Sequence, residues 1–363
     1  DKVGMTKAWS YDISAACSGF LFGLQTAASF IKSGTYKKVV MVGADMMSSI
    51  TDYTDRTTCP LFGDAAAAVL VEAVEDGLGV RDSILEVDDL AVSFRDRRSR
   101  GRARLNAVRS MSLTLAKGET LAVVGESGSG KTSLARAVMG LIPADSGKVL
   151  FLGDTLPTRV DQRSLAVHRE LQMIFQDPLA SLNPAMRVSD IVAEPLRTHS
   201  SGGGDYAETV AQMIEQVGLE EKLLHRYPHE LSGGQAQRVA IARALILKPG
   251  VIICDEAVAA LDGSVQNEIL ELLQAEQQRS GLSLIFIAHD LAVVRQISHR
   301  VLVMYMGRLC ELAESDSLFR RPRHPYTKAL LNAVPQADPD ATPVDAPLMG
   351  EVSSVLYPPC LVY

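Results

Sequence analysis

The chain of 363 residues has little of what would mark several common classes of protein. Its five cysteines are scattered and show no C-x-x-C metal spacing, so we expect a reduced, cytoplasmic setting. No apolar run reaches the ~20 residues that span a bilayer, which leaves only a peripheral membrane role. A net charge of −7 gives no strong overall field for nucleic acid. Neither a methionine nor a signal-like segment opens the chain at Asp1, and we expect both ends to be cut.

A glycine-rich loop is the clearest feature that the sequence does contain. Residues 125–132 read GESGSGKT and match the phosphate-loop pattern G-x-x-x-x-G-K-[ST] in full. A buried-strand pattern over 121–124 precedes the loop, and a helical pattern from Lys131 follows it. In this order backbone N–H groups and the helix N-terminus face an anion, Lys131 reaches the β- and γ-phosphates, and Thr132 offers its hydroxyl to Mg²⁺. The sequence therefore predicts a site for a magnesium–nucleotide complex.

A second motif lies about a hundred residues further on, where residues 231–235 read LSGGQ. A Gly-Gly turn alone would mean little, but this one precedes a helical pattern over 237–245. The motif is the signature of the ATP-binding cassette family, which the chain resembles from about Leu85 to Cys360. The resemblance implies that the signature closes over ATP held by a second subunit, so that one chain forms half of an ATP-driven clamp.

Three further segments resemble the catalytic parts of that family. Residues 251–256 read as a buried strand that ends in Asp255 and Glu256, and a bare pair of acidic residues at a strand end is the alternative. The resemblance implies that Asp255 holds Mg²⁺ and that Glu256 orients or deprotonates the hydrolytic water. It also implies that Gln176 touches Mg²⁺ or the water and that His289 bonds the γ-phosphate. Each of these two would be an ordinary side chain if it stood alone.

The complete set of expected site residues follows from the two motifs and the resemblance. The predicted catalytic residues are Gln176, Glu256 and His289, and the predicted Mg²⁺ ligands are Thr132, Gln176 and Asp255. The predicted contacts to ATP are Phe94, Gly125, Ser127, Gly128, Gly130, Lys131, Thr132, Ser133, Ser232, Gly233, Gly234, Gln235 and Asp262. Phe94 matches the family's adenine-stacking position, although an isolated phenylalanine is more often a core residue. It ends a run, 86–94, whose alternation predicts an edge strand.

The segment around Asp262 departs from the family pattern at three positions. Ala257, Ala259 and Gly263 stand where proline, serine and valine are usual. The resemblance places this segment between the two ATP sites of a dimer. We expect hydrolysis to survive because Glu256 is retained, and the sequence leaves open whether coupling between the sites is weakened.

The C-terminal part resembles the extension found on ATPases of oligopeptide and dipeptide importers, on the evidence of residues 321–331, 347–352 and 358–360. That resemblance implies a bacterial-type subunit at the cytoplasmic face of the plasma membrane. Its partners would be a second ABC ATPase, in a homo- or heterodimer, two permease subunits and, indirectly, a solute-binding protein, with no nucleic acid. The transported cargo is not encoded here. A soluble cassette ATPase of DNA repair or translation is the alternative, and the extension argues against it.

Residues 1 to about 84 resemble a different family. The stretches 12–20, 42–45 and 62–64 resemble β-ketoacyl-acyl-carrier-protein synthase III, a thiolase-fold condensing enzyme. We expect a helix over 18–32 and strands over 37–43 and 66–71. The resemblance makes Cys17 the former nucleophile of an acyltransferase. All seven histidines lie at His168 or later, and the half that carries the family's catalytic His and Asn is missing, so we expect Cys17 to be inactive.

The predicted fold is α/β throughout. A partial thiolase-like αβ fragment covers 1–84, an ABC-type P-loop NTPase domain covers 85–335 with a helical subdomain at about 180–230, and a truncated C-terminal extension covers 336–363. The junction near Ser83–Asp89 has no linker composition. Our hypothesis is a chimeric reading frame or an assembly artefact, and a peptide spanning 80–92 in a digest of the native protein would contradict it.

We predict that radiolabelled acetyl-CoA leaves no label on the protein, because no histidine is available to polarise the thioester at Cys17. The measurement is protein-bound radioactivity after denaturing electrophoresis. A label that disappears in Cys17→Ser would show that the condensing-enzyme fragment is active.

Overall fold

The computed structural model describes residues 19–36, 38–45, 65–72, 83–95, 104–200, 204–259 and 261–333. These residues belong to two compact units, 1–81 and 82–363. Cys17, the stretch 62–64 and the predicted extension 336–363 lie outside the described residues. No helix in the described part of the chain has both the length and the apolar character needed to cross a bilayer.

The first unit consists of one helix and a two-stranded sheet. Helix α1 spans Gly19–Lys32, and strands β1, Lys38–Asp45, and β2, Ala65–Glu72, pair antiparallel along their full length. The helix and both strands were expected from the sequence and are confirmed. Val40 and Val42 point to the same face of β1, and 54% and 65% of their surfaces are exposed. This unit therefore leaves part of its sheet face uncovered.

The second unit is built on a six-stranded sheet in the order β12-β11-β5-β10-β9-β8. The strands are β5 (Thr120–Val124), β8 (Leu171–Ile174), β9 (Val251–Asp255), β10 (Ser283–Ile287), β11 (Arg300–Tyr305) and β12 (Arg308–Glu314). All neighbours are parallel except β12, which runs antiparallel to β11. Strands β5, β9 and β10 are buried along their whole length, as their continuous apolar runs predict.

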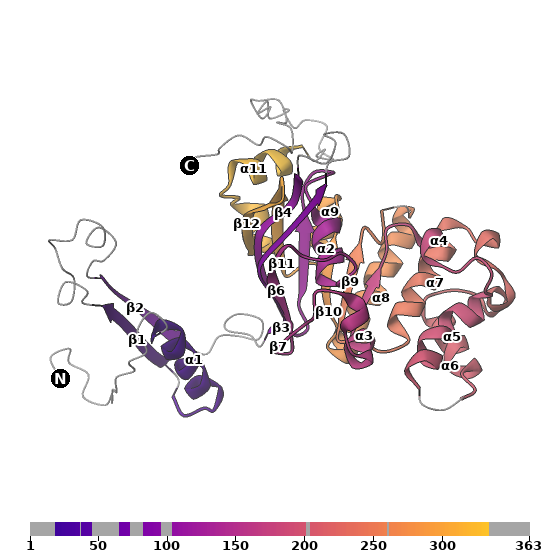
Figure 1. Ribbon diagram of the computed structural model, residues 1–363, viewed down its shortest axis with the longest axis horizontal. Coiled ribbons are helices and arrows are strands. Elements are labelled where there is room, and N and C mark those ends of the chain that lie inside the picture. The colour runs from indigo at the N-terminus through magenta and orange to yellow at the C-terminus, as the bar shows by residue number, and fades with distance from the viewer. Residues whose placement is uncertain are drawn as a thin grey trace. The chain divides into compact units, whose positions relative to one another are not determined.

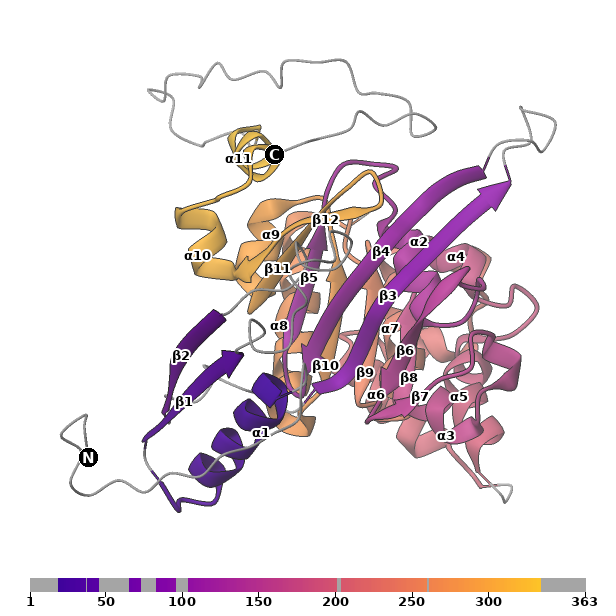
Figure 2. The ribbon, with the colours of Figure 1, turned by 60° about the vertical axis from the view of Figure 1, so that its left-hand side comes forward.

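A four-stranded antiparallel sheet packs against one side of the first, in the order β4-β3-β6-β7 (Figure 2). Its strands are β3 (Ser83–Arg95), β4 (Arg104–Ala116), β6 (Ser146–Phe151) and β7 (Asp154–Thr155). One continuous core joins the two sheets through residues such as Leu85, Leu115 and Leu121. The prediction of an edge strand over 86–94 was wrong, because β3 lies between β4 and β6 and hydrogen-bonds to both.

The helices fall into two groups (Figure 1). Those connected with the large sheet are α2 (Lys131–Val138), α3 (Leu165–Glu170), α8 (Gly263–Ser280), α9 (Leu291–Ile297), α10 (Ser315–Arg320) and α11 (Pro325–Asn332). A separate helical group contains α4 (Pro178–Ser181), α5 (Val188–His199), α6 (Ala207–Gln216) and α7 (Gly233–Leu245), with 3₁₀ turns at 221–225 and 228–230. Its apolar faces meet around α7, where Ala236, Val239 and Ile241 are fully buried.

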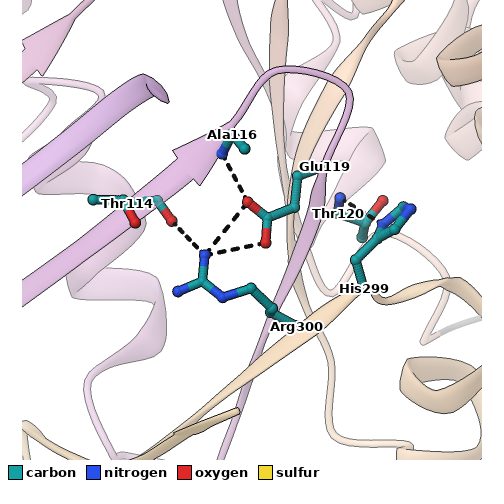
Figure 3. A network of polar contacts seen from close by, with 6 residues as sticks. All are labelled: Thr114, Ala116, Glu119, Thr120, His299 and Arg300. Carbon is teal, nitrogen blue, oxygen red and sulfur yellow. Dashed lines mark hydrogen bonds and ion pairs between the residues drawn. The ribbon is translucent and has the colours of Figure 1, made fainter. Parts of the chain in front are cut away.

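A buried ion pair ties the two sheets together at the amino end of β5 (Figure 3). Glu119 lies in the turn between β4 and β5, is 1% exposed, and accepts the Ala116 backbone N–H at 2.7 Å. One nitrogen of the Arg300 guanidinium lies 3.1 Å from the Glu119 carboxylate and 3.2 Å from the Thr114 carbonyl oxygen. The cation on β11 therefore holds the carboxylate and β4 at the same time.

We predict that Arg300→Met lowers the free energy of unfolding by about 2 kcal/mol, since it leaves a buried carboxylate without its cation. This is below the loss from a fully buried pair because the Arg300 side chain is 27% exposed. The measurement is the midpoint of urea unfolding. Arg308→Met, an exposed arginine on β12, is the control and should change stability by no more than about 0.5 kcal/mol. Equal midpoints for the two variants would contradict the role of the pair.

Candidate functional site

The phosphate loop connects the carboxyl end of β5 to α2, and its backbone leaves no room for side chains at two glycines. Gly125 has φ 150° and Gly130 has φ 105°, a region that favours glycine. A Cβ on Gly125 would lie 2.1 Å from the Met304 carbonyl oxygen, and one on Gly130 would lie 2.1 Å from that of Ala107. The loop therefore packs closely against the backbone at Met304 and at Ala107, and this packing requires glycine at both positions.

Lys131 opens α2 and turns its ammonium group back over the loop. Its Nζ donates to the carbonyl oxygens of Gly125 at 2.8 Å and Glu126 at 2.9 Å, and the residue is 6% exposed. Burial lowers the pKa of Lys131, and the charges of Glu256 and Asp255 oppose that shift. The geometry places a desolvated cation directly above the loop whose N–H groups would face phosphate oxygens.

Thr132 and Asp255 form a pair of oxygen ligands beside that cation. The Thr132 hydroxyl donates to the Asp255 carboxylate at 3.0 Å, and Asp255 is 1% exposed at the end of β9. Burial raises the pKa of Asp255, while the hydrogen bond from Thr132 opposes the shift. A hydroxyl and a buried carboxylate are the hard oxygen donors that Mg²⁺ prefers, so the donor set fits this ion.

Glu256 is the centre of a second group of polar side chains. Its carboxylate accepts a hydrogen bond from the Gln176 amide at 2.7 Å and lies 3.9 Å from Nδ1 of His289. The three residues follow the neighbouring strands β8, β9 and β10. Glu256 adopts φ 50°, which is uncommon for a residue with a side chain, and its N–H donates to the Ile287 carbonyl at 3.0 Å. This turn directs the carboxylate to the edge of the sheet, where it meets Gln176, which lies 80 residues earlier in the chain.

The signature residues lie apart from the phosphate loop, within the helical group around α7 (Figure 1). Ser232 caps α7: its hydroxyl accepts the Gln235 N–H at 3.2 Å, and the Gln235 side chain accepts the Ser232 N–H at 3.0 Å. No hydrogen bond joins 231–235 to 125–132 among the residues the structure describes. Ser232 and Gly233 are exposed at the surface, and Gly234 borders Leu261.

Asp262 also acts as a helix cap. Its carboxylate accepts the Val265 N–H at 3.0 Å at the start of α8. Ala257 is buried, Ala259 is exposed, and a Cβ on Gly263 would meet no atom within 4 Å. The departures from the family pattern at these positions leave the cap of α8 in place.

The remaining predicted contacts differ in how far they are exposed. Ser127 and Gly128 are exposed, Ser133 is partly buried in α2, and Phe94 is 40% exposed at the end of β3 opposite Leu105. An exposed ring is compatible with stacking on a base, and the adenine role of Phe94 stays a prediction.

The sequence did not predict two hydrogen bonds that distant residues make to the backbone of the phosphate loop. The Gly307 N–H donates to the Ser129 carbonyl at 2.8 Å, and the hydroxyl of Tyr326 accepts the N–H of Glu126 at 3.1 Å. Tyr326 lies in the run 321–331, which the sequence marked only as part of an extension. Nothing in the sequence indicates a partner for it two hundred residues away.

Comparisons with known proteins show what this geometry is similar to. A family model described as ABC transporter matches residues 108–259, one for the oligopeptide/dipeptide transporter C-terminal region matches 310–360, and one for 3-oxoacyl-[acyl-carrier-protein] synthase III matches 11–88. The oligopeptide transport ATP-binding protein OppF of Salmonella typhimurium is 51% identical over 289 residues, which are 77% of this chain and 86% of the relative. OppF of Escherichia coli is 49% identical over 80% of this chain and 88% of its own length.

Solved structures show the same fold. A dimeric ATP-binding cassette in a post-hydrolysis state with ADP and Pi has a TM-score of 0.58 at 24% identity, over 64% of this chain and 98% of that one. The protein cbiO1 of Clostridium perfringens, part of the cbiONQ ABC transporter complex, has a TM-score of 0.57 at 28% identity, over 66% of this chain and 92% of its own. The predicted ABC-type α/β fold is thereby confirmed.

We predict that Lys131→Ala weakens nucleotide binding about 100-fold or more, because the buried ammonium group over the loop is lost. The measurement is calorimetric titration of the full chain with ADP and Mg²⁺. Lys117→Ala, an exposed lysine at the opposite end of β5, is the control and should bind like the wild type. Undiminished binding by Lys131→Ala would refute the assignment of the loop.

Proposed function

This chain belongs to the ATP-binding proteins of the ABC transporter family, and on that premise we propose that it hydrolyses ATP to power an importer of the oligopeptide/dipeptide class. The fold and the relatives make it an ABC-type ATPase. The peptide class is supported by relatives named for oligopeptide transport and by the match of 310–360 to the transporter C-terminal region. The observation that carries the ATPase site is the meeting of Lys131, the Thr132–Asp255 pair and the Glu256 group at one edge of a parallel sheet.

In the proposed reaction one group of residues binds the phosphates and another holds Mg²⁺. The loop N–H groups and Lys131 bind the phosphates, and Lys131 exchanges its two carbonyl acceptors for phosphate oxygens. Thr132 and Asp255 would hold Mg²⁺, with Gln176 as a further oxygen ligand. The ion, when bound, neutralises charge that develops on the β- and γ-phosphate oxygens.

Glu256 is the proposed base for the attacking water. Its carboxylate faces the site rather than the core, and Gln176 fixes one of its oxygens at 2.7 Å. The other oxygen is left to accept a proton from the water as the water attacks the γ-phosphorus. The bond from the γ-phosphorus to the oxygen that bridges to the β-phosphate breaks in this step, and ADP and phosphate are the products. His289 is the proposed donor to the γ-phosphate, and its ring lies within 3.9 Å of the same carboxylate.

The signature is proposed to serve the ATP of a second subunit. Within one chain its residues are exposed and make no hydrogen bond to 125–132 in the described part. Because Gly233 and Gly234 form the first turn of α7, their N–H groups and the Ser232 hydroxyl suit an anion. A like or homologous ATPase would bring its own phosphate loop to this end, and ATP would then close the pair.

The other partners and the location belong to the same proposal. Two permease subunits would receive the ATPase pair at the cytoplasmic face of the membrane, and a solute-binding protein would deliver the cargo to the permeases. The support is that cbiO1, 28% identical, is part of an ABC transporter complex, together with the relatives named for transport. Co-purification of permeases with this chain would test the assembly. If membrane extracts contained none of this chain, the proposed assembly would be contradicted.

The division of the chain into 1–84, 85–335 and 336–363 also stays a proposal. It is supported by the synthase III match over 11–88 and by the separation into two compact units. Acyl transfer at Cys17 is not proposed, because the matched stretch contains no histidine.

We predict that Glu256→Gln lowers ATP turnover by about 10²- to 10⁴-fold while ATP binding is retained, since only the proton acceptor is lost. Phosphate release measures turnover, and size-exclusion chromatography with ATP should show more of the dimer. Glu271→Gln, an exposed residue of α8, is the matched control. Normal turnover in Glu256→Gln would mean that another group is the base, and lost ATP binding would mean that Glu256 serves binding instead.

A further inference from the structure

Helix α11 contacts the phosphate loop through a single buried phenol. Tyr326 is 4% exposed, and its oxygen accepts the backbone N–H of Glu126 at 3.1 Å. Glu126 follows Gly125, the first glycine of the loop, and its carbonyl oxygen is one of the two that Lys131 holds. The phenol therefore acts on the segment that also positions the ammonium group over the nucleotide.

Tyr326 is fixed in place by its own surroundings. Its ring packs on that of Tyr305, with centroids 4.5 Å apart and planes inclined by 40°. Glu311 on β12 accepts the backbone N–H groups of Arg323 at 2.9 Å and His324 at 3.0 Å, just before α11 begins. Burial alone would raise the pKa of Glu311, but the nearby Thr327 hydroxyl and the hydrogen bonds from these two N–H groups hold it below its usual range. An ionised carboxylate thus anchors the start of the helix.

The chemistry of the phenol suits an acceptor close to bound phosphates. Burial raises the pKa of Tyr326 to about 12, so the group is neutral at physiological pH and does not repel an anion. A neutral phenol oxygen still offers lone pairs to an N–H donor. The Glu126 N–H is partly buried, and an unpaired N–H in such a place is costly.

The other contacts behind the loop come from the cassette core itself. Gly307, in the turn between β11 and β12, donates to Ser129, and the Met304 carbonyl abuts Gly125. Tyr326 is different because it lies on α11, inside the region 310–360 that matches the transporter C-terminal model. The C-terminal region thereby reaches the nucleotide loop directly.

We infer that Tyr326 is a positioning residue for the phosphate loop: its hydroxyl holds the Glu126 backbone so that the loop is preorganised for nucleotide, and it thereby couples the C-terminal region to ATP binding. The inference rests on the proposed function. It assigns a role in nucleotide affinity to a helix outside the phosphate-loop, signature and carboxylate motifs. A mere structural anchor would stabilise the fold without changing affinity for nucleotide.

The first test compares two matched phenylalanine variants of the full chain. Tyr326→Phe keeps the ring stack and removes the acceptor, whereas Tyr305→Phe removes the hydroxyl of the stacking partner. We expect Tyr326→Phe to raise the Kd for ADP with Mg²⁺ and the KM for ATP about five- to tenfold, with kcat unchanged within about twofold. Hydrogen exchange of a peptide covering 122–130 should be faster in this variant alone. Tyr305→Phe should match the wild type in every measurement.

Wild-type affinity in Tyr326→Phe, or an equal loss in both variants, would overturn the inference while the proposed function stands. If the wild-type chain bound no nucleotide, the proposed function would fall and the inference with it. These outcomes are distinguished in the same titration series.

The second test asks whether Glu311 affects the Kd for ADP through the position of Tyr326. Glu311→Ala releases the start of α11 and should also raise the Kd for ADP. The double variant Glu311→Ala/Tyr326→Phe should then bind no more weakly than the weaker single variant, because the phenol of a released helix has already lost its partner. Fully additive losses would show that Glu311 does not work through Tyr326 and would remove the coupling to the C-terminal region.

Discussion

The register of four parallel strands is the constraint on which the rest of the molecule depends. Val123 of β5, Ile287 of β10 and Asp255 of β9 stand opposite one another, and Ile174 of β8 stands opposite Cys254. Each strand is followed at once by a polar segment, so the phosphate loop, Glu256, His289 and Gln176 emerge at one edge. A slip of one residue would move every side chain of the shifted strand to the opposite face of the sheet and would separate these groups. The buried Glu119–Arg300 pair at the other end of β5 holds β4 and β11 in the same alignment.

Helix capping explains how the signature that we propose for the ATP of a second subunit can be stable within one chain. Ser232 and Asp262 each accept an N–H of their own helix, at α7 and α8. These bonds stabilise two helix ends that are exposed at the surface. The first turn of α7 also carries the N–H groups of Gly233 and Gly234, which suit an anion. This helix end can therefore be stable in the isolated chain and still serve the proposed contact with a nucleotide brought by a partner. The phosphate loop is different, because Gly125 and Gly130 are shaped by backbone packing within the chain.

Much of the catalytic side of this site was predictable from the sequence, because its parts are short contiguous motifs. A strand, a glycine loop and a lysine at a helix start specify phosphate binding locally, and a strand that ends in two carboxylates specifies the metal and water side. The sequence-based prediction was wrong where the result depends on how strands pair with one another. The run 86–94 shows the alternation of a strand with one solvated face, yet β3 has a strand on each side. Alternation reports which face is buried and carries no information on how many neighbours hydrogen-bond to the strand.

The sequence by itself determined the family and the ATPase chemistry, and it proposed the groups that carry that chemistry, because the motifs consist of neighbouring residues along the chain. Only the tertiary structure decided that Glu256 adopts φ 50° and meets Gln176. It alone placed Tyr326 against Glu126. Contacts between residues 80 or 200 positions apart depend on strand order and helix packing, and no local pattern of residue types records which distant N–H a buried phenol will meet.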